Sequence, residues 1–185
     1  MGFWNNCRMD INKQEPKGIL LITGTVGTGK TVVATEIGEQ LGSMSILNAV
    51  IDLDWLGWIN VGDDFDQYDS LIMQNVISAW QNYHAAGVEY LVLARMLLQR
   101  EPVDILTRAF PHTPITIVRL VTSKNSIENR LSQRDSGETL REHLHEIDVM
   151  NRVLGELHLE HATVYNEDQS VEDTARQVIN FINWK

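Results

Sequence analysis

One short stretch of the chain combines three glycines, a lysine and a threonine between two apolar segments. It reads G-T-V-G-T-G-K-T from Gly24 to Thr31, after the apolar run Gly18–Thr23 and before V-V-A-T-E-I-G-E-Q-L. Glycines allow the backbone to curl tightly and to turn its N–H groups inward, where they bind phosphate oxygens. The amino end of a following helix adds partial positive charge. The stretch therefore predicts a phosphate-binding loop between a strand and a helix.

The spacing of this loop matches G-x-x-x-x-G-K-[ST], the Walker A pattern or P-loop. We expect Lys30 to reach the β- and γ-phosphates of a nucleotide and the Thr31 hydroxyl to hold Mg²⁺. The predicted nucleotide-binding residues of the loop are Gly24, Thr25, Val26, Gly27, Thr28, Gly29, Lys30 and Thr31.

Two aspartates follow the second apolar run, in the segment I-D-L-D-W-L-G-W. Asp52 and Asp54 are two residues apart, so on an extended chain both side chains point to one side. One carboxylate there can take a proton from an acceptor hydroxyl, and the other can hold Mg²⁺. We take Asp52 with Thr31 as the magnesium candidates and keep both aspartates as candidates for the base. Two aspartates that simply end a strand at a turn are the alternative.

Three arginines, Arg130, Arg134 and Arg141, bracket the segment D-S-G-E at residues 135–138. Phosphoryl transfer spreads negative charge over three oxygens, which a mobile arginine can neutralise while a closing segment excludes water. Arg130 and Arg134 are four residues apart and so share one helical face. We therefore predict a short lid here, with an ordinary charged surface helix as the alternative. Arg95 follows the third apolar run, where it would contact an acceptor or pair with an aspartate.

The remaining chain alternates between apolar runs and amphipathic segments. Strands are predicted at 18–23, 46–53, 88–94, 115–121 and 162–166, and helices at 31–41, 69–86, 102–110, 125–134, 139–160 and after Ser170. A capping box at Thr139–Glu142 is expected to begin the penultimate helix, and Ser170 in the segment Ser170–Asp173 is expected to cap the last helix. Such alternation predicts a parallel sheet covered on both faces, with ligands bound beyond the carboxyl ends of its strands. Residues 1–17 are expected to form an N-terminal arm, and residues 18–185 a single domain.

Composition favours a cytoplasmic protein. The formal net charge of −10 opposes binding to a nucleic acid backbone. A single cysteine, Cys7, fits a reducing compartment. We find no signal peptide and no apolar stretch long enough to span a bilayer, so neither a membrane nor a nucleic acid is an expected partner.

The loop, the chain length and the strand–helix alternation resemble the P-loop kinases of small molecules over residues 18–183. These include shikimate, gluconate, adenylyl-sulfate and chloramphenicol kinases and the tunicamycin-resistance type. The resemblance implies an α/β three-layer sandwich, a five-stranded parallel sheet in the order 2-3-1-4-5, and ATP with Mg²⁺ as the donor. The match of R-L-S-Q-R-D at 130–135 to the lid of these kinases implies that Arg130 stacks on the adenine and Arg134 reaches the phosphates.

Four aromatic residues, Trp55, Trp58, Phe65 and Tyr68, occupy the stretch that lines the acceptor pocket in the resembling kinases. Aromatic walls suit a flat or apolar acceptor, although the same residues could instead pack a helix against the sheet. The acidic segment Asp63–Asp69 favours a solvated loop that ends in a helix cap.

The function that we expect is transfer of the γ-phosphoryl group of ATP to a hydroxyl of a small molecule. The candidate catalytic residues are Lys30, Asp52, Asp54 and Arg134. The alternative is a nucleotide-binding or ATPase module without a metabolite acceptor. The third and fourth strands are predicted to end without a carboxylate, which argues against an ATPase of the motor type.

Overall fold

The computed structural model describes residues 14–58 and 65–184, except the side chains of residues 65–67 and 134. Within these residues the strands are β1 (Gly18–Thr23), β2 (Asn48–Asp52), β3 (Tyr90–Ala94), β4 (Ile115–Val121) and β5 (Ala162–Tyr165). Neighbouring strands are parallel, and their order across the sheet is β2-β3-β1-β4-β5. The predicted five-stranded parallel sheet and its strand order are confirmed.

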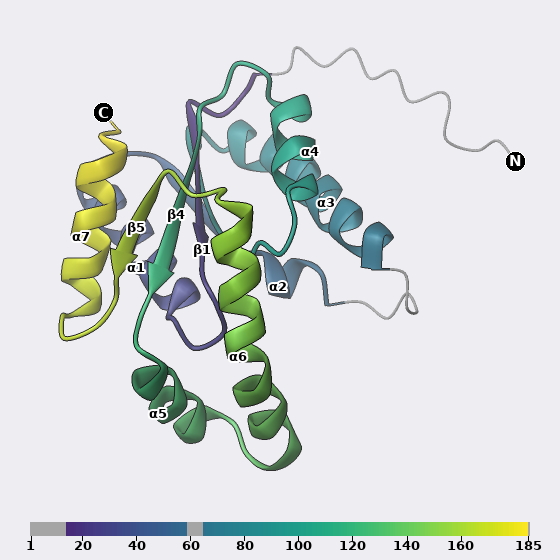
Figure 1. Ribbon diagram of the computed structural model, residues 1–185. Helices are drawn as coiled ribbons and strands as arrows, with labels where there is room; N and C mark the ends of the chain where they lie inside the picture. Colours follow the sequence, from purple (N-terminus) through teal and green to yellow (C-terminus); the bar gives the residue numbers. More distant parts are fainter. Residues whose placement is uncertain (1–13, 59–64, 185) are drawn as a thin grey trace, which may run out of the picture.

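The two faces of the sheet are covered by different helices (Figure 1). The helices of the described chain are α1 (Lys30–Ser43), α2 (Leu53–Leu56), α3 (Phe65–Ala85), α4 (Glu101–Ala109), α5 (Lys124–Arg134), α6 (Gly137–Leu157) and α7 (Val171–Ile182). Successive residues of a strand point to opposite faces. Accordingly Leu20 packs with residues of α1 and α7, whereas Leu21 packs with residues of α3 and α4. All six residues of β1 are buried, so this strand lies at the centre of both cores.

Helices α5 and α6 contact each other and form a small third cluster around Ile127, Leu131 and Ile147. Figure 1 shows α5 beyond the carboxyl ends of β4 and β5. The connection between the two helices is only Asp135 and Ser136, which agrees with the short lid predicted at the D-S-G-E segment. This helix pair therefore borders the edge of the sheet where a ligand is expected.

Several predicted boundaries are wrong by a few residues. The helix expected from Thr139 begins instead at Gly137, because the chain turns at Ser136 and Gly137 adopts a left-handed φ of 63°. The Thr139–Glu142 capping box therefore does not begin α6. The capping role predicted for Ser170 is correct, since its hydroxyl accepts a hydrogen bond from the N–H of Asp173 at 3.1 Å.

The segment after β2 differs more strongly from its prediction. Asp52 ends the strand and caps α2, because its carboxylate accepts the N–H of Asp54 at 3.0 Å. The assumption that Asp52 and Asp54 share one extended strand is therefore wrong. Asp69 is not a cap at the end of a solvated loop, since it lies inside α3 with its side chain 15% exposed. Asp63 and Asp64 lie outside the described residues.

Residues 14–17 of the predicted N-terminal arm contact the domain, and residues 1–13 lie outside the described chain. The Trp80 indole N–H donates to the carbonyl of Gln14 at 2.8 Å, and the N–H of Lys17 donates to the carbonyl of Glu89 at 2.8 Å. In the described residues no helix is both long and apolar enough to cross a bilayer.

The position of β1 predicts a large cost for truncating its buried side chains. Leu21→Ala should lower the free energy of unfolding by about 2–5 kcal/mol, because the fully buried site would be left with a cavity. Urea titration followed by circular dichroism measures the change. The control Leu47→Ala, at a position 55% exposed, should change it by less than about 1 kcal/mol. Equal effects of the two variants would contradict this description of the core.

Candidate active site

The phosphate loop depends on glycines with backbone angles that other residues rarely adopt. Gly24 has φ 145°, and a Cβ there would lie 2.5 Å from the carbonyl oxygen of Leu120 in β4. Gly29 has φ 90° and is the N-cap of α1; a Cβ there would lie 2.8 Å from the Asn166 amide nitrogen. A side chain at either position would therefore strain or displace the loop. No side chain caps the first turn of α1, so this helix end suits an anionic ligand.

The back of the loop is held by a chain of hydrogen bonds. The Thr28 hydroxyl donates to the carbonyl of Thr25 at 2.8 Å, and the Asn166 amide donates to the carbonyl of Thr28 at 2.7 Å. Asn166 is itself fixed, since the Thr174 hydroxyl of α7 donates to its side-chain oxygen at 3.0 Å. Thr28, Asn166 and Thr174 are all buried. These contacts tie the loop to the end of β5 and to α7.

Lys30 and Thr31 begin α1 at the open side of the loop. The Lys30 ammonium donates to the carbonyl of Thr25 at 3.1 Å, and the Thr31 hydroxyl donates to the Asp52 carboxylate at 2.6 Å. A hydroxyl and a carboxylate at this separation supply the oxygen ligands that Mg²⁺ prefers. Together with the curled loop, these residues fit a nucleotide with its metal ion.

Asp54 lies two residues after Asp52, in the first turn of α2, and its side chain belongs to a different network. Its side chain is 68% exposed and accepts from the guanidinium of Arg95 at 3.3 Å. The same guanidinium forms an ion pair with Asp69, whose other oxygen accepts from the Gln99 amide at 2.6 Å. Arg95 also lies over the ring of Tyr68, 5.8 Å from its centroid. Of the two predicted possibilities, pairing with aspartates is therefore what the structure shows for Arg95.

The lid residues divide into three cases. Arg130 donates to the carbonyl of Gly27 at 3.3 Å and to that of Asn166 at 3.0 Å, so its guanidinium lies beside the phosphate loop. Arg134 ends α5, and its side chain lies outside the described residues. Arg141 is exposed on α6 and does not line the described cavity. The roles of Arg130 and Arg134 toward a nucleotide remain predictions.

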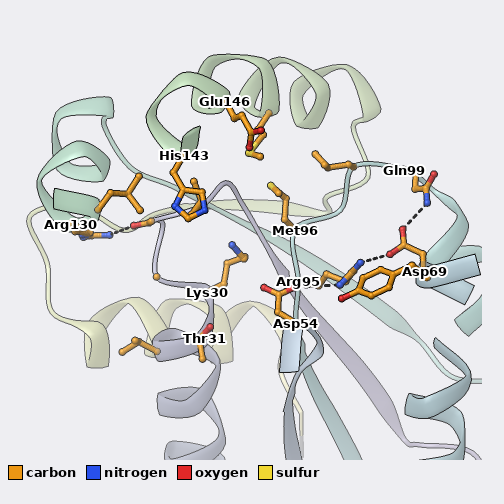
Figure 2. A pocket seen from close by; sticks show the side chains of 18 residues that line it. Lys30, Thr31, Asp54, Asp69, Arg95, Met96, Gln99, Arg130, His143 and Glu146 are labelled. Carbon is orange, nitrogen blue, oxygen red and sulfur yellow. Dashed lines mark hydrogen bonds and ion pairs between the residues drawn. The ribbon is translucent and has the colours of Figure 1, made fainter. Parts of the chain in front are cut away.

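These groups surround one open cavity of about 910 Å³ (Figure 2). This volume lies at the upper end of the usual range for small-molecule sites, roughly 300–1,000 Å³. Loop residues Gly27, Lys30 and Thr31, together with Arg130, line one part of it, and Asp54, Asp69 and Arg95 line another. Further lining residues are Val26, Gly29, Val32, Tyr68, Met96, Leu98, Gln99, Leu131, His143, Glu146 and Met150. Asp52 is not one of the lining residues and is joined to them through its hydrogen bond from Thr31.

The aromatic residues after Asp54 do not form a common wall. Trp55 and Trp58 stack on one another with centroids 5.2 Å apart and are 71% and 77% exposed. Neither lines the described cavity, and neither packs a helix against the sheet. Tyr68 does line the cavity, whereas the side chain of Phe65 lies outside the described residues. The expected aromatic pocket is therefore reduced to Tyr68 among the described side chains.

Sequence reasoning missed several residues at the cavity. Asp69 was not recognised as the partner of Arg95 and Gln99, because α3 and the segment after β3 meet only in the folded chain. His143 and Glu146 reach the cavity from α6, where His143 forms a 2.7 Å contact with the Asp135 carboxylate. Asn166 is the last residue of the predicted fifth strand, and this position at the carboxyl edge was the available signal.

Glu167 follows Asn166 and fixes the start of α5. Hydrogen bonds from the Ser123 hydroxyl, the Ser126 hydroxyl and the Ser123 N–H lower the pKa of Glu167 below its ordinary value. The Ser126 hydroxyl lies 2.7 Å and the Ser123 N–H 2.9 Å from the carboxylate. This carboxylate joins the end of β5 to the helix that carries Arg130.

No protein-family model matches the chain, and no curated protein matches it significantly. Solved structures do match over nearly its whole length. The tunicamycin resistance protein of Deinococcus radiodurans aligns with a TM-score of 0.65 and 14% identity, covering 93% of this chain and 98% of that one. The gluconokinase of Sinorhizobium meliloti 1021 aligns with a TM-score of 0.62 and 18% identity, covering 92% of this chain and 94% of that one. The APS kinase of Mycobacterium tuberculosis, in complex with AMPPNP and APS, aligns with a TM-score of 0.60 and 17% identity, covering 91% of this chain and 99% of that one.

The chain has the fold of the P-loop small-molecule kinases. The predicted resemblance is thereby confirmed at the level of structure. The TM-scores of 0.60–0.65 establish the fold alone, because sequence identities of 14–18% do not extend the likeness to the reaction.

The lowered pKa of Glu167 predicts an acid-dependent contribution to stability. Above the ordinary carboxyl pKa of 4.5, Glu167→Gln should have a lower free energy of unfolding than the wild type, because the ionised acceptor is lost. As the pH falls through the lowered folded-state pKa, the wild-type carboxylate becomes protonated and the difference should vanish. Urea titrations between pH 7 and pH 3 measure it, with exposed Glu39→Gln as the control. A difference that grows on acidification would contradict the assignment.

Proposed function

We propose that this protein is a phosphotransferase that moves the γ-phosphoryl group of ATP to a hydroxyl of a small molecule. The observation that carries the proposal is one cavity that is lined both by groups suited to bind phosphate and by a carboxylate suited to accept a hydroxyl proton. The phosphate loop with Lys30 and Thr31 lies on one side, and the exposed carboxylate of Asp54 lies on the other. The kinase-like fold supports the proposal.

On the donor side, bound ATP and Mg²⁺ supply the phosphoryl group and part of the charge neutralisation. The loop amides and the Lys30 ammonium bind the phosphate oxygens, and Thr31 and Asp52 hold the metal ion. Arg130 hydrogen-bonds to Gly27 and Asn166, beside the loop, from where its planar guanidinium stacks on the base. Arg134, at the end of α5, reaches the phosphates when the lid closes.

On the acceptor side, Asp54 takes the proton of the acceptor hydroxyl. The acceptor oxygen then forms a bond to the γ-phosphorus while the bond from that phosphorus to the bridging oxygen of ADP breaks. Two features favour Asp54 over Asp52 as the base. Asp54 lines the cavity directly, whereas the oxygens of Asp52 accept from Thr31 and from the N–H of Asp54. Arg95 orients the Asp54 carboxylate, since its guanidinium lies 3.3 Å from one of the carboxylate oxygens.

A nucleotide-hydrolysing module without an acceptor is less well supported. Its attacking water would need a carboxylate at the end of β3 or β4, whereas β3 is followed by Arg95 and β4 by Thr122 and Ser123.

Incubation with ATP, Mg²⁺ and a panel of hydroxylated metabolites and antibiotics tests the proposed phosphotransferase function. ADP release should stay near zero until an acceptor is added and then rise at least tenfold. Vigorous ADP release that no compound changes would overturn it.

Lys30→Ala should weaken the binding of Mg²⁺–ATP at least about tenfold, because the ammonium that faces the phosphates is lost. Isothermal titration calorimetry measures the dissociation constant. Lys124→Ala removes an exposed lysine that pairs with Asp148 on the lid helices and serves as the matched control. Unaltered binding by the Lys30 variant would refute the phosphate-loop assignment.

Asp54→Asn should lower kcat with the identified acceptor by about 10²–10⁴-fold, because an amide cannot accept the hydroxyl proton. Binding of Mg²⁺–ATP should be unchanged. Asp52→Asn should instead raise the Mg²⁺ concentration required for half-maximal rate. Steady-state kinetics at several Mg²⁺ concentrations separates the two effects, with exposed Asp173→Asn as a control. If neither aspartate variant alters turnover, both roles are wrong.

A further inference from the structure

The acceptor part of the cavity is rich in negative charge. Three carboxylates line it: Asp54 from α2, Asp69 from α3 and Glu146 from α6. Apart from His143, whose imidazole contacts the Asp135 carboxylate, the basic side chains that line the described cavity are Lys30, Arg95 and Arg130. Lys30 and Arg130 belong to the phosphate loop and its flank. Arg95 is therefore the cation of the acceptor part, where carboxylates outnumber it three to one. Figure 2 shows Asp54, Arg95 and Asp69 together at one side and Glu146 reaching in from α6.

Arg95 is already engaged by two of these carboxylates. Its guanidinium bridges Asp54 and Asp69, and its side chain is only 12% exposed. Gln99 holds the second oxygen of Asp69 at 2.6 Å, which fixes the ion pair in this position. An acceptor that carried a carboxylate or phosphate would have to compete with these partners for Arg95. It would also meet the fields of Asp54 and Glu146 without a compensating cation.

Glu146 differs from the other two carboxylates. It projects from the lid helix toward the cavity and has no ion-pair or hydrogen-bond partner among the described residues. The side chains of Met96, Leu98 and Met150 line the same cavity and offer apolar surface for a carbon framework. A ligand with a protonated amine could pair with Glu146 while its carbon framework contacts these residues.

We propose that the acceptor is a hydroxylated amine, with its ammonium group bound by Glu146 and its reacting hydroxyl at Asp54. The proposal rests on the phosphotransferase function argued above and adds the charge class of the substrate. It also excludes carboxylated acceptors such as gluconate and shikimate. Bound nucleotide phosphates add further negative charge nearby, which favours a cationic acceptor still more.

Two matched sets of compounds test the charge class by binding, without the need for turnover. The first set is glucosamine, glucose and gluconate, and the second is phenylalaninol, 3-phenyl-1-propanol and phenyllactate. Each compound is added to the full-length protein with Mg²⁺ and a non-hydrolysable ATP analogue, and the thermal unfolding midpoint is recorded. The amine of at least one set should raise the midpoint more than its neutral and carboxylated counterparts.

The Glu146→Gln variant should weaken the affinity for that amine about tenfold. The control Glu156→Gln, at an exposed position of the same helix, should leave the affinity unchanged.

The possible results separate this inference from the proposed function. Stabilisation by the carboxylated compounds, equal effects of all three classes, or no stabilisation by either amine would overturn the charge assignment. An unchanged affinity in Glu146→Gln would overturn the role of that residue. Selective binding of amines without ADP release from any hydroxylated amine would leave the charge assignment intact and contradict the phosphotransferase function.

Discussion

A loop that turns its amides toward a single point needs support on its opposite side. In this protein the support is the hydrogen-bonded line from Thr28 through Asn166 to Thr174. These groups are buried, so leaving any of them without its partner costs about 1–3 kcal/mol. The line also ties the loop between β1 and α1 to the far edge of the sheet. The curvature required for phosphate binding therefore depends on β5 and α7, which lie more than a hundred residues further along the chain.

The acceptor part of the site depends on a second interaction, the ion pair between Arg95 and Asp69. Both side chains are mostly buried, at 12% and 15% exposure, and Gln99 completes the hydrogen bonding of the carboxylate. A pair of this kind is valuable mainly for the geometry that it specifies, because desolvation offsets much of its attraction. Here it directs the guanidinium toward Asp54, which remains open to the cavity. Orientation of the candidate base is thus built from α2, α3 and the end of β3.

The phosphate part and the acceptor part of the cavity differ in charge, and this difference distinguishes the ligand that each part favours. Cations and loop amides gather where phosphate is expected, while carboxylates exceed cations where the acceptor is expected. If cations exceeded carboxylates in the acceptor part as well, both parts of the cavity would favour anionic ligands. The lid helix α6 contributes to the acceptor part through Glu146, so acceptor binding and the position of the lid are coupled in the proposed function.

The sequence by itself determined the phosphate loop, the parallel sheet and the strand order expected from the resemblance. Gly24–Thr31 could be interpreted locally, because its glycine, lysine and threonine spacing encodes both conformation and chemistry within eight residues. The buried strands were equally evident, since continuous apolar runs such as Gly18–Thr23 carry their own signal. The tertiary structure decided what no local pattern contains. It separated Asp52 from Asp54 by starting α2 between them. It also brought Asp69 to Arg95 and Gln99, and Asn166 to the loop. These contacts join residues 26 to 138 positions apart, and such pairings are set by how the helices pack on the sheet.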